Sequence, residues 1–117
     1  MSIKTSSGKA KGRLLQKSVC QMILSRFTEL EADDCKSTSM GAGGEDVQLS
    51  PAARRLIPIS IECKARKGIA IYDWYQQAKD NCKDGLEPVL VVKADRKKPL
   101  VCIDAEFFLD LMKGRVQ

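Results

Sequence analysis

Two carboxylates and one lysine in the middle of the chain are the residues best suited to chemistry. Residues 44–64 read GEDVQLSPAARRLIPISIECK, in which Asp46 lies sixteen residues before Glu62 and Lys64 follows two residues later. Mg²⁺ and Mn²⁺ bind a few carboxylate oxygens and keep several waters, which leaves room for a phosphate substrate. Such a metal activates water and neutralises charge on a phosphodiester, and a nearby lysine can orient the water. The residue types therefore indicate metal-dependent phosphodiester hydrolysis.

Alternating residues predict two short strands that would bring these side chains together. Polar and apolar residues alternate from Ile57 to Lys64, with Glu62 and Lys64 on one parity, and again from Asp46 to Leu49. A period of two is typical of a half-buried strand, with the isoleucines inward and the charges on an open face. Ser50-Pro51 reads as a turn or the start of a one-turn helix. The same pattern is also compatible with a cross-strand salt-bridge ladder on a solvated sheet face.

The motif Asp46…Glu62-Cys63-Lys64 resembles the D…(D/E)-x-K signature of the PD-(D/E)XK nuclease superfamily. The longer stretch STSMGAGGEDVQLSPAARR…SIECK is similar to phage-type Holliday junction resolvase-like nucleases, and the likeness runs from residue 11 to about residue 112. The resemblance implies that Asp46, Glu62 and the carbonyl of Cys63 hold Mg²⁺ or Mn²⁺, and that Lys64 is the catalytic lysine. It also implies cleavage of branched DNA, such as four-way junctions, by a homodimer.

Three further candidates follow from the same resemblance. Many resolvases add a glutamate from the first helix, and the counterpart here is the neutral Gln16, which on its pattern could equally be a boundary polar residue. Gln77, with Gln76 as its rival, matches a glutamine that points toward the metal, although a solvated glutamine fits as well. Ser39 matches a serine in the loop before the aspartate, where local turn bonds are the commoner use of serine.

Composition excludes several classes of protein. The 117 residues contain no histidine, which excludes Ser-His-Asp triads and imidazole metal sites. The five cysteines are widely spaced without a C-x-x-C pair, so we expect reduced thiols. No apolar run is long enough to span a membrane, and no secretory signal follows the early lysines, so we expect no membrane and a cytoplasmic location.

The net charge of +5 is gathered in clusters and indicates a polyanionic partner, here DNA. An ordinary basic surface is the alternative. Residues 1–8 should form a mobile basic arm, or a plain disordered terminus, before a single nuclease domain at 9–117. The expected nucleic-acid-binding residues are Lys9, Lys11, Arg13, Lys17, Ser39, Arg66 and Lys67.

The elements predicted around the site follow the order αββαββα, an α/β (α+β) fold with a central mixed sheet flanked by helices, as in the restriction-endonuclease-like core. A first helix runs from residue 9 or 11 to 31, and a Gly-rich loop covers 33–44. A second helix begins at 71 and closes near 85, and strands cover 88–93 and 100–103. Asp104 caps a final helix that carries Phe107, Phe108, Leu111 and Met112 inward.

Two alternative functions remain open on the sequence. A non-catalytic nucleic-acid-binding domain would keep the fold without the chemistry, and the neutral Gln16 favours it. A structure-selective nickase of replication or repair would share the fold and the metal site.

Overall fold

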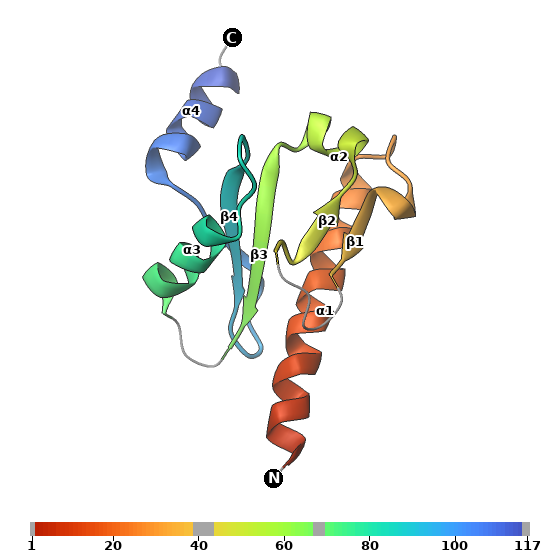
Figure 1. Ribbon diagram of the computed structural model, residues 1–117, viewed down its shortest axis with the longest axis vertical. Coiled ribbons are helices and arrows are strands. Elements are labelled where there is room, and N and C mark those ends of the chain that lie inside the picture. Colours follow the sequence, from red (N-terminus) through yellow and green to blue (C-terminus); the bar gives the residue numbers. More distant parts are fainter. Residues whose placement is uncertain (1, 39–43, 67–69, 116–117) are drawn as a thin grey trace.

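The structure, a computed structural model, describes residues 2–38, 44–66 and 70–115 (Figure 1). Five strands form one mixed sheet in the order β1-β2-β3-β4-β5. The elements in chain order are α1 (Ser2–Arg26), the 3₁₀ turn η1 (Ala32–Asp34), β1 (Cys35–Ser37), β2 (Val47–Leu49), α2 (Pro51–Leu56), β3 (Ile59–Ala65), α3 (Ile71–Asp80), β4 (Glu87–Lys93), β5 (Leu100–Cys102) and α4 (Ala105–Arg115).

The sheet combines antiparallel and parallel pairs. β1 with β2, β2 with β3, and β4 with β5 are antiparallel, whereas β3 and β4 are parallel and joined through α3. Parallel strands run in the same direction, so the chain must cross back over the sheet between them, and a tight turn is too short for this connection. The expected mixed α/β class is thus confirmed, with β1, η1 and α2 added to the predicted order.

One face of the sheet carries the main core under α1. Leu15 and Val19 of α1 are buried against Ile61 and Cys63 of β3 and Val91 of β4. Figure 1 shows α1 lying across the sheet at β1–β3. The helix begins at Ser2 rather than near residue 9, so residues 2–8, expected as an arm, continue α1, and it ends at Arg26 rather than at 31.

The other face is covered by α3, and this corrects the expected open face. Ala78 of α3 and Leu90 and Val92 of β4 are buried on this side. Glu62 and Ser60 share this face of β3 and are also buried, at 6% and 3% exposure. β3 is a central strand that is covered on both faces. The prediction of one open face was wrong, because alternation within a strand cannot show whether a helix packs over its polar residues.

The predicted loop at 33–44 is structured in its first half. Asp34 connects two elements: its Oδ2 accepts from the Glu31 backbone N–H (2.7 Å), and its Oδ1 accepts from the Ser50 hydroxyl (2.7 Å). Ser50 in turn caps α2 by accepting from the Ala53 N–H, with Pro51 at the first helical position. Of the turn or one-turn helix expected at Ser50-Pro51, the helix is present, and η1 and β1 replace the first part of the predicted loop.

The last helix is more exposed than its pattern predicted. Asp104 Oδ1 accepts from the Phe107 N–H (3.0 Å) and caps α4 as expected. Phe108 and Leu111 were expected inward but are each 47% exposed, because α4 extends away from the sheet (Figure 1). Among the described residues, no helix is both long and apolar enough to cross a membrane.

Candidate active site

Asp46 is fixed at the start of β2 by three hydrogen bonds. Its N–H donates to the Ile61 carbonyl (3.1 Å), and its carbonyl accepts from the Thr38 N–H (2.9 Å). Its carboxylate Oδ2 accepts from the Cys63 N–H (2.9 Å). The side chain of Asp46 is thus held against the middle of β3, where β2 separates from it.

Glu62 lies beside Asp46 in a poorly hydrated position. Its Oε2 is 3.5 Å from Lys64 Nζ and its Oε1 accepts from Asn81 Nδ2 (3.4 Å). The side chain is 8% exposed, so the Glu62–Lys64 contact is not a pair on a solvated surface. Burial, and next the Asp46 carboxylate, raise the pKa of Glu62. Two carboxylates and one ammonium therefore converge here.

Cys63 offers its backbone rather than its sulfur to this site. Its thiol belongs to the core under α1, and burial raises the pKa of that thiol, so it stays protonated. In an antiparallel pair a strand residue turns its N–H and C=O to the same side. Because the Cys63 N–H meets Asp46, the Cys63 carbonyl also faces the side on which Asp46 lies.

Gln16 is buried in the sheet-facing part of α1. It is 9% exposed, and its carbonyl Oε1 is buried without a hydrogen-bond partner in the described part of the protein. A buried amide oxygen left without a partner costs stability and calls for an explanation, such as a bound water or ion.

The amide that contacts Glu62 from α3 is Asn81, not Gln77. Gln77 is exposed, and within the described ranges no hydrogen bond joins its side chain to Asp46, Glu62 or Lys64. Gln76 donates to Asp80 Oδ1 instead (2.9 Å). Asn81 lies three residues after the buried Ala78, a spacing that places both on one helix face. That spacing was a usable signal for Asn81.

Glu45 is a second buried carboxylate, which the sequence did not single out, and it helps to hold the segment that leads to Asp46. Glu45, with a side chain 3% exposed, accepts from both Nη atoms of Arg54 (2.6 and 3.3 Å) and lies 3.7 Å from Lys83 Nζ. Burial acts to raise the pKa of Glu45, but hydrogen bonds from Arg54 and Ser60 hold it below its usual value. Its carbonyl accepts from the Thr38 hydroxyl. Arg54 therefore anchors the residue that precedes Asp46.

The residues expected to bind nucleic acid divide into three groups. Lys9, Arg13 and Lys17 are exposed at four-residue spacing, so they form one positive line along α1. Lys11 instead pairs with Asp95 (2.9 Å), and Arg66 is exposed with Nη1 donating to the Ala65 carbonyl. Ser39 and Lys67 lie outside the described residues.

The arrangement provides two acidic side chains rather than three. In the described part of the chain, no group of three Cys, Asp or Glu side chains is placed to hold a metal. Asp46, Glu62 and the Cys63 carbonyl would together supply oxygen atoms only, which suits Mg²⁺ or Mn²⁺. No family model, curated protein or solved structure matches this chain.

Proposed function

We propose that this protein is an endodeoxyribonuclease of the PD-(D/E)XK type that uses Mg²⁺ or Mn²⁺ and hydrolyses phosphodiester bonds in branched DNA. We also propose that its fold is a restriction-endonuclease-like core. The observation that carries it is the convergence of the half-buried Asp46 carboxylate and the buried Glu62 carboxylate beside Lys64. Two carboxylates packed together repel each other, and a divalent cation is the partner that relieves this repulsion.

The residues present fit such a cation. Glu62 has a raised pKa because its carboxylate is buried next to another. Asp46, Glu62 and the Cys63 carbonyl would hold the ion. When bound, it supplies a more acidic water and positive charge for the phosphate.

The remaining side chains have separate roles in the proposed reaction. Lys64 holds a positive charge within reach of Glu62, where it can orient the attacking water or stabilise negative charge on the phosphate oxygens. Asn81 holds Glu62 Oε1 in place. The Cys63 N–H fixes Asp46 Oδ2 and leaves its other oxygen for the ion.

Two surfaces support the proposed partners. The line of Lys9, Arg13 and Lys17 on α1 suits a DNA backbone, because each cation can replace a condensed counterion. Exposed apolar side chains occur on β5 and α4, and a second copy of the chain could bury some of them in the expected homodimer. They are Leu100, Val101, Phe108, Leu109 and Leu111.

The test is cleavage of labelled four-way junction, duplex and single-stranded DNA with Mg²⁺ or with EDTA. Asp46→Asn and Glu62→Gln should each lower the rate at least about a hundredfold, roughly 3 kcal/mol, while DNA binding persists. The exposed Asp73→Asn on α3 serves as the matched control. Undiminished Mg²⁺-dependent cutting by either site variant would refute the site.

A second candidate function is a non-catalytic nucleic-acid-binding domain, which the neutral Gln16 favours. It predicts that the wild-type protein binds junction DNA and leaves every substrate intact at any Mg²⁺ or Mn²⁺ concentration. The same assay therefore separates the two functions. Gln16→Glu adds a discriminating variant, because the resemblance implies a first-helix carboxylate at the metal, and such a third carboxylate should strengthen metal binding.

A further inference from the structure

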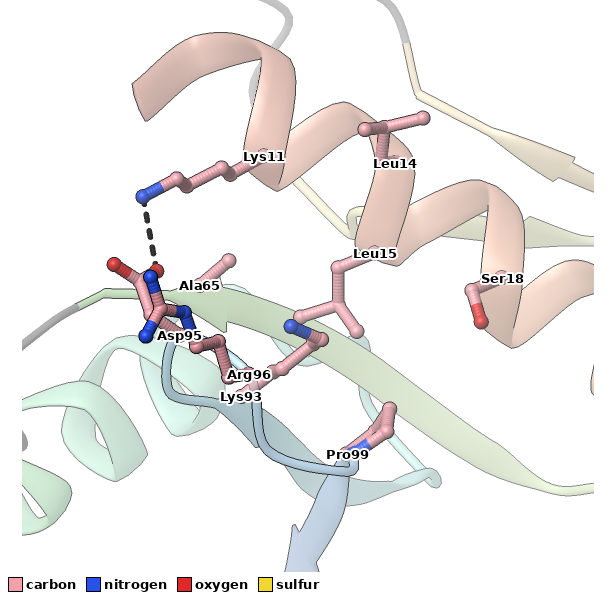
Figure 2. Close-up of a pocket in the computed structure, with 9 residues that line it drawn as sticks. All are labelled: Lys11, Leu14, Leu15, Ser18, Ala65, Lys93, Asp95, Arg96 and Pro99. Atoms are coloured by element: carbon pink, nitrogen blue, oxygen red, sulfur yellow. Dashed lines mark hydrogen bonds and ion pairs between the residues drawn. The ribbon is translucent and has the colours of Figure 1, made fainter. Parts of the chain in front are cut away.

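A cavity of about 490 Å³ lies on the α1 face of the sheet, away from Glu62. It is enclosed by the first half of α1, the ends of β3 and β4, and the turn between β4 and β5 (Figure 2). Its volume is in the usual range for small-ligand sites, roughly 300–1,000 Å³. Its lining residues are Lys11, Leu14, Leu15, Ser18, Ala65, Lys93, Asp95, Arg96 and Pro99.

The charges of this cavity favour an anion. Lys11, Lys93 and Arg96 supply three positive charges against the one carboxylate of Asp95. Asp95 holds Lys11 Nζ at 2.9 Å, with both side chains about 40% exposed, so Lys11 is oriented yet reachable. Figure 2 shows Lys11 reaching from α1 toward Asp95 and Arg96, while Lys93 lies along the sheet. A phosphate is the anion that suits lysine and arginine together.

The wall of the cavity is apolar, which a bare phosphate would not require. Leu14, Leu15, Ala65 and Pro99 supply hydrocarbon, and Leu14 is 66% exposed at the mouth. A flat ring can lie on such a surface with the planar guanidinium of Arg96 against its other side, as arginine does with unstacked bases. A ligand that carries both a phosphate and a flat ring is a nucleotide.

Arg96 occupies a backbone conformation that its side chain does not favour. The Lys97 N–H donates to the Ala94 carbonyl (3.1 Å), which closes a turn, and Arg96 has φ of 63° at its third position. Glycine or asparagine is the usual residue there, because a Cβ is strained at positive φ. Retaining arginine at such a position is typical of a functional residue.

We propose that this cavity binds one unpaired nucleotide of a DNA strand, with its phosphate on Lys11 and Lys93 and its base between Arg96 and the apolar wall. The inference rests on the proposed function, because it takes the ligand to be DNA. Ala65 follows Lys64 directly on β3, so the cavity and the candidate active site occupy opposite faces of one strand end. A strand unpaired near a branch point could reach both.

The test is fluorescence anisotropy in EDTA, where binding is measured without cleavage. The probes are a labelled duplex, the same duplex with one extrahelical thymidine, and the same duplex with an extrahelical abasic site. Stacking of one base should make the thymidine probe bind about tenfold tighter than the other two. Leu14→Asp should abolish this preference, whereas Leu56→Asp, an exposed leucine of α2, should keep it.

Arg96→Gly provides the second variant. It should lose the preference while its melting temperature stays equal or rises, because glycine relieves the positive φ. Lys97→Ala removes the same charge outside the cavity and should keep the preference.

Three results would overturn the inference: equal affinity of the wild type for all three probes, a preference retained in both cavity variants, or free dTMP binding as tightly as the thymidine probe. Absence of cleavage in Mg²⁺ would refute the proposed function without affecting this assay.

Discussion

Glu62 is a buried acid in an unfavourable position. Among the described residues, Lys64 and Asn81 are its favourable partners, while the nearby Asp46 carboxylate raises its pKa. Such a residue lowers the stability of the protein, as is common where function requires unfavourable burial.

Glu62→Gln should therefore stabilise the protein in EDTA, because an amide removes the repulsion with Asp46 and keeps the shape. Mg²⁺ at ten times its dissociation constant should stabilise the wild type by about 1.4 kcal/mol and the variant by much less. Urea unfolding with and without Mg²⁺ measures both effects. An equal Mg²⁺ response in the two proteins would mean that the ion does not bind at Glu62.

Lys64→Met separates a catalytic lysine from a salt-bridge partner. The variant keeps the aliphatic stem, so packing changes little, but it removes the ammonium that contacts Glu62. Cleavage should fall at least about a hundredfold, while Mn²⁺ binding measured by calorimetry stays equal or becomes tighter, since one competing cation is gone. Lys79→Met, exposed on α3, is the control. Near-wild-type turnover would leave Lys64 as a structural partner of Glu62.

Among the elements, the short ones around Asp34 hold the chain that leads to Asp46. Asp34 accepts hydrogen bonds from the Ser50 hydroxyl and the Glu31 N–H, and these hold the pKa of its carboxyl below the ordinary value of 3.8. A depressed pKa means that the ionised form stabilises the fold.

Asp34→Asn should be less stable than the wild type at neutral pH, and the difference should disappear in acid. The contribution of Asp34 is fully present above pH 3.8 and is lost as the pH falls through its lowered pKa in the folded protein. Unfolding followed by circular dichroism from pH 7 to pH 2 measures this. A difference that stayed constant with pH would show that the carboxylate charge is not what stabilises this junction.

The sequence predicted the long, periodic elements and missed what depends on distant packing. The core positions Leu15, Val19 and Ile61 followed from their spacing. β1 has only three residues, which is too short for a pattern to show. The burial of Glu62 depends on α3 crossing over β3, and no alternation within one strand carries that information.

The candidate site was predicted in the same uneven way. Asp46, Glu62 and Lys64 were selected by their types and spacing, and the structure brings them together. Gln77, with Gln76 as its rival, was selected because the resemblance suggested a glutamine, whereas the amide that contacts Glu62 is that of Asn81. Glu45 was missed because an acid beside Asp46 shows no sign of its pairing with Arg54 nine residues later.

At the scale of the whole molecule, positive charge follows α1 along the longest dimension. The molecule measures 54 × 30 × 27 Å, and α1 reaches past the sheet toward the N-terminal end (Figure 1). A charged helix of this kind acts mainly through phosphates, and thus through salt-dependent affinity rather than base recognition.

Replacing Lys9 and Arg13 with glutamine should weaken DNA binding and flatten its salt dependence. Two lost phosphate contacts lower the slope of log K against log salt by up to about 1.8 on duplex DNA. The slope is measured by anisotropy titrations at roughly 50 to 200 mM salt, a range over which such losses of affinity are large. Replacing Lys79 and Lys113, exposed on α3 and α4, should leave it unchanged, and an unchanged slope in the α1 variant would exclude α1 from the DNA interface.

The unequal pairing of β3 with its two neighbours has a consequence for local opening. β3 matches β4 over seven residue pairs but matches β2 only at Val47 and Ile61. The segment that carries Asp46 should therefore detach at lower free energy than the β3–α3–β4 unit that carries Glu62. The Cys63 N–H, which donates a hydrogen bond to Asp46, should therefore lose its protection from hydrogen exchange before the Leu90 N–H does. An ion shared by Asp46 and Glu62 would bind the two segments to each other, so adding Mg²⁺ should slow exchange at Cys63.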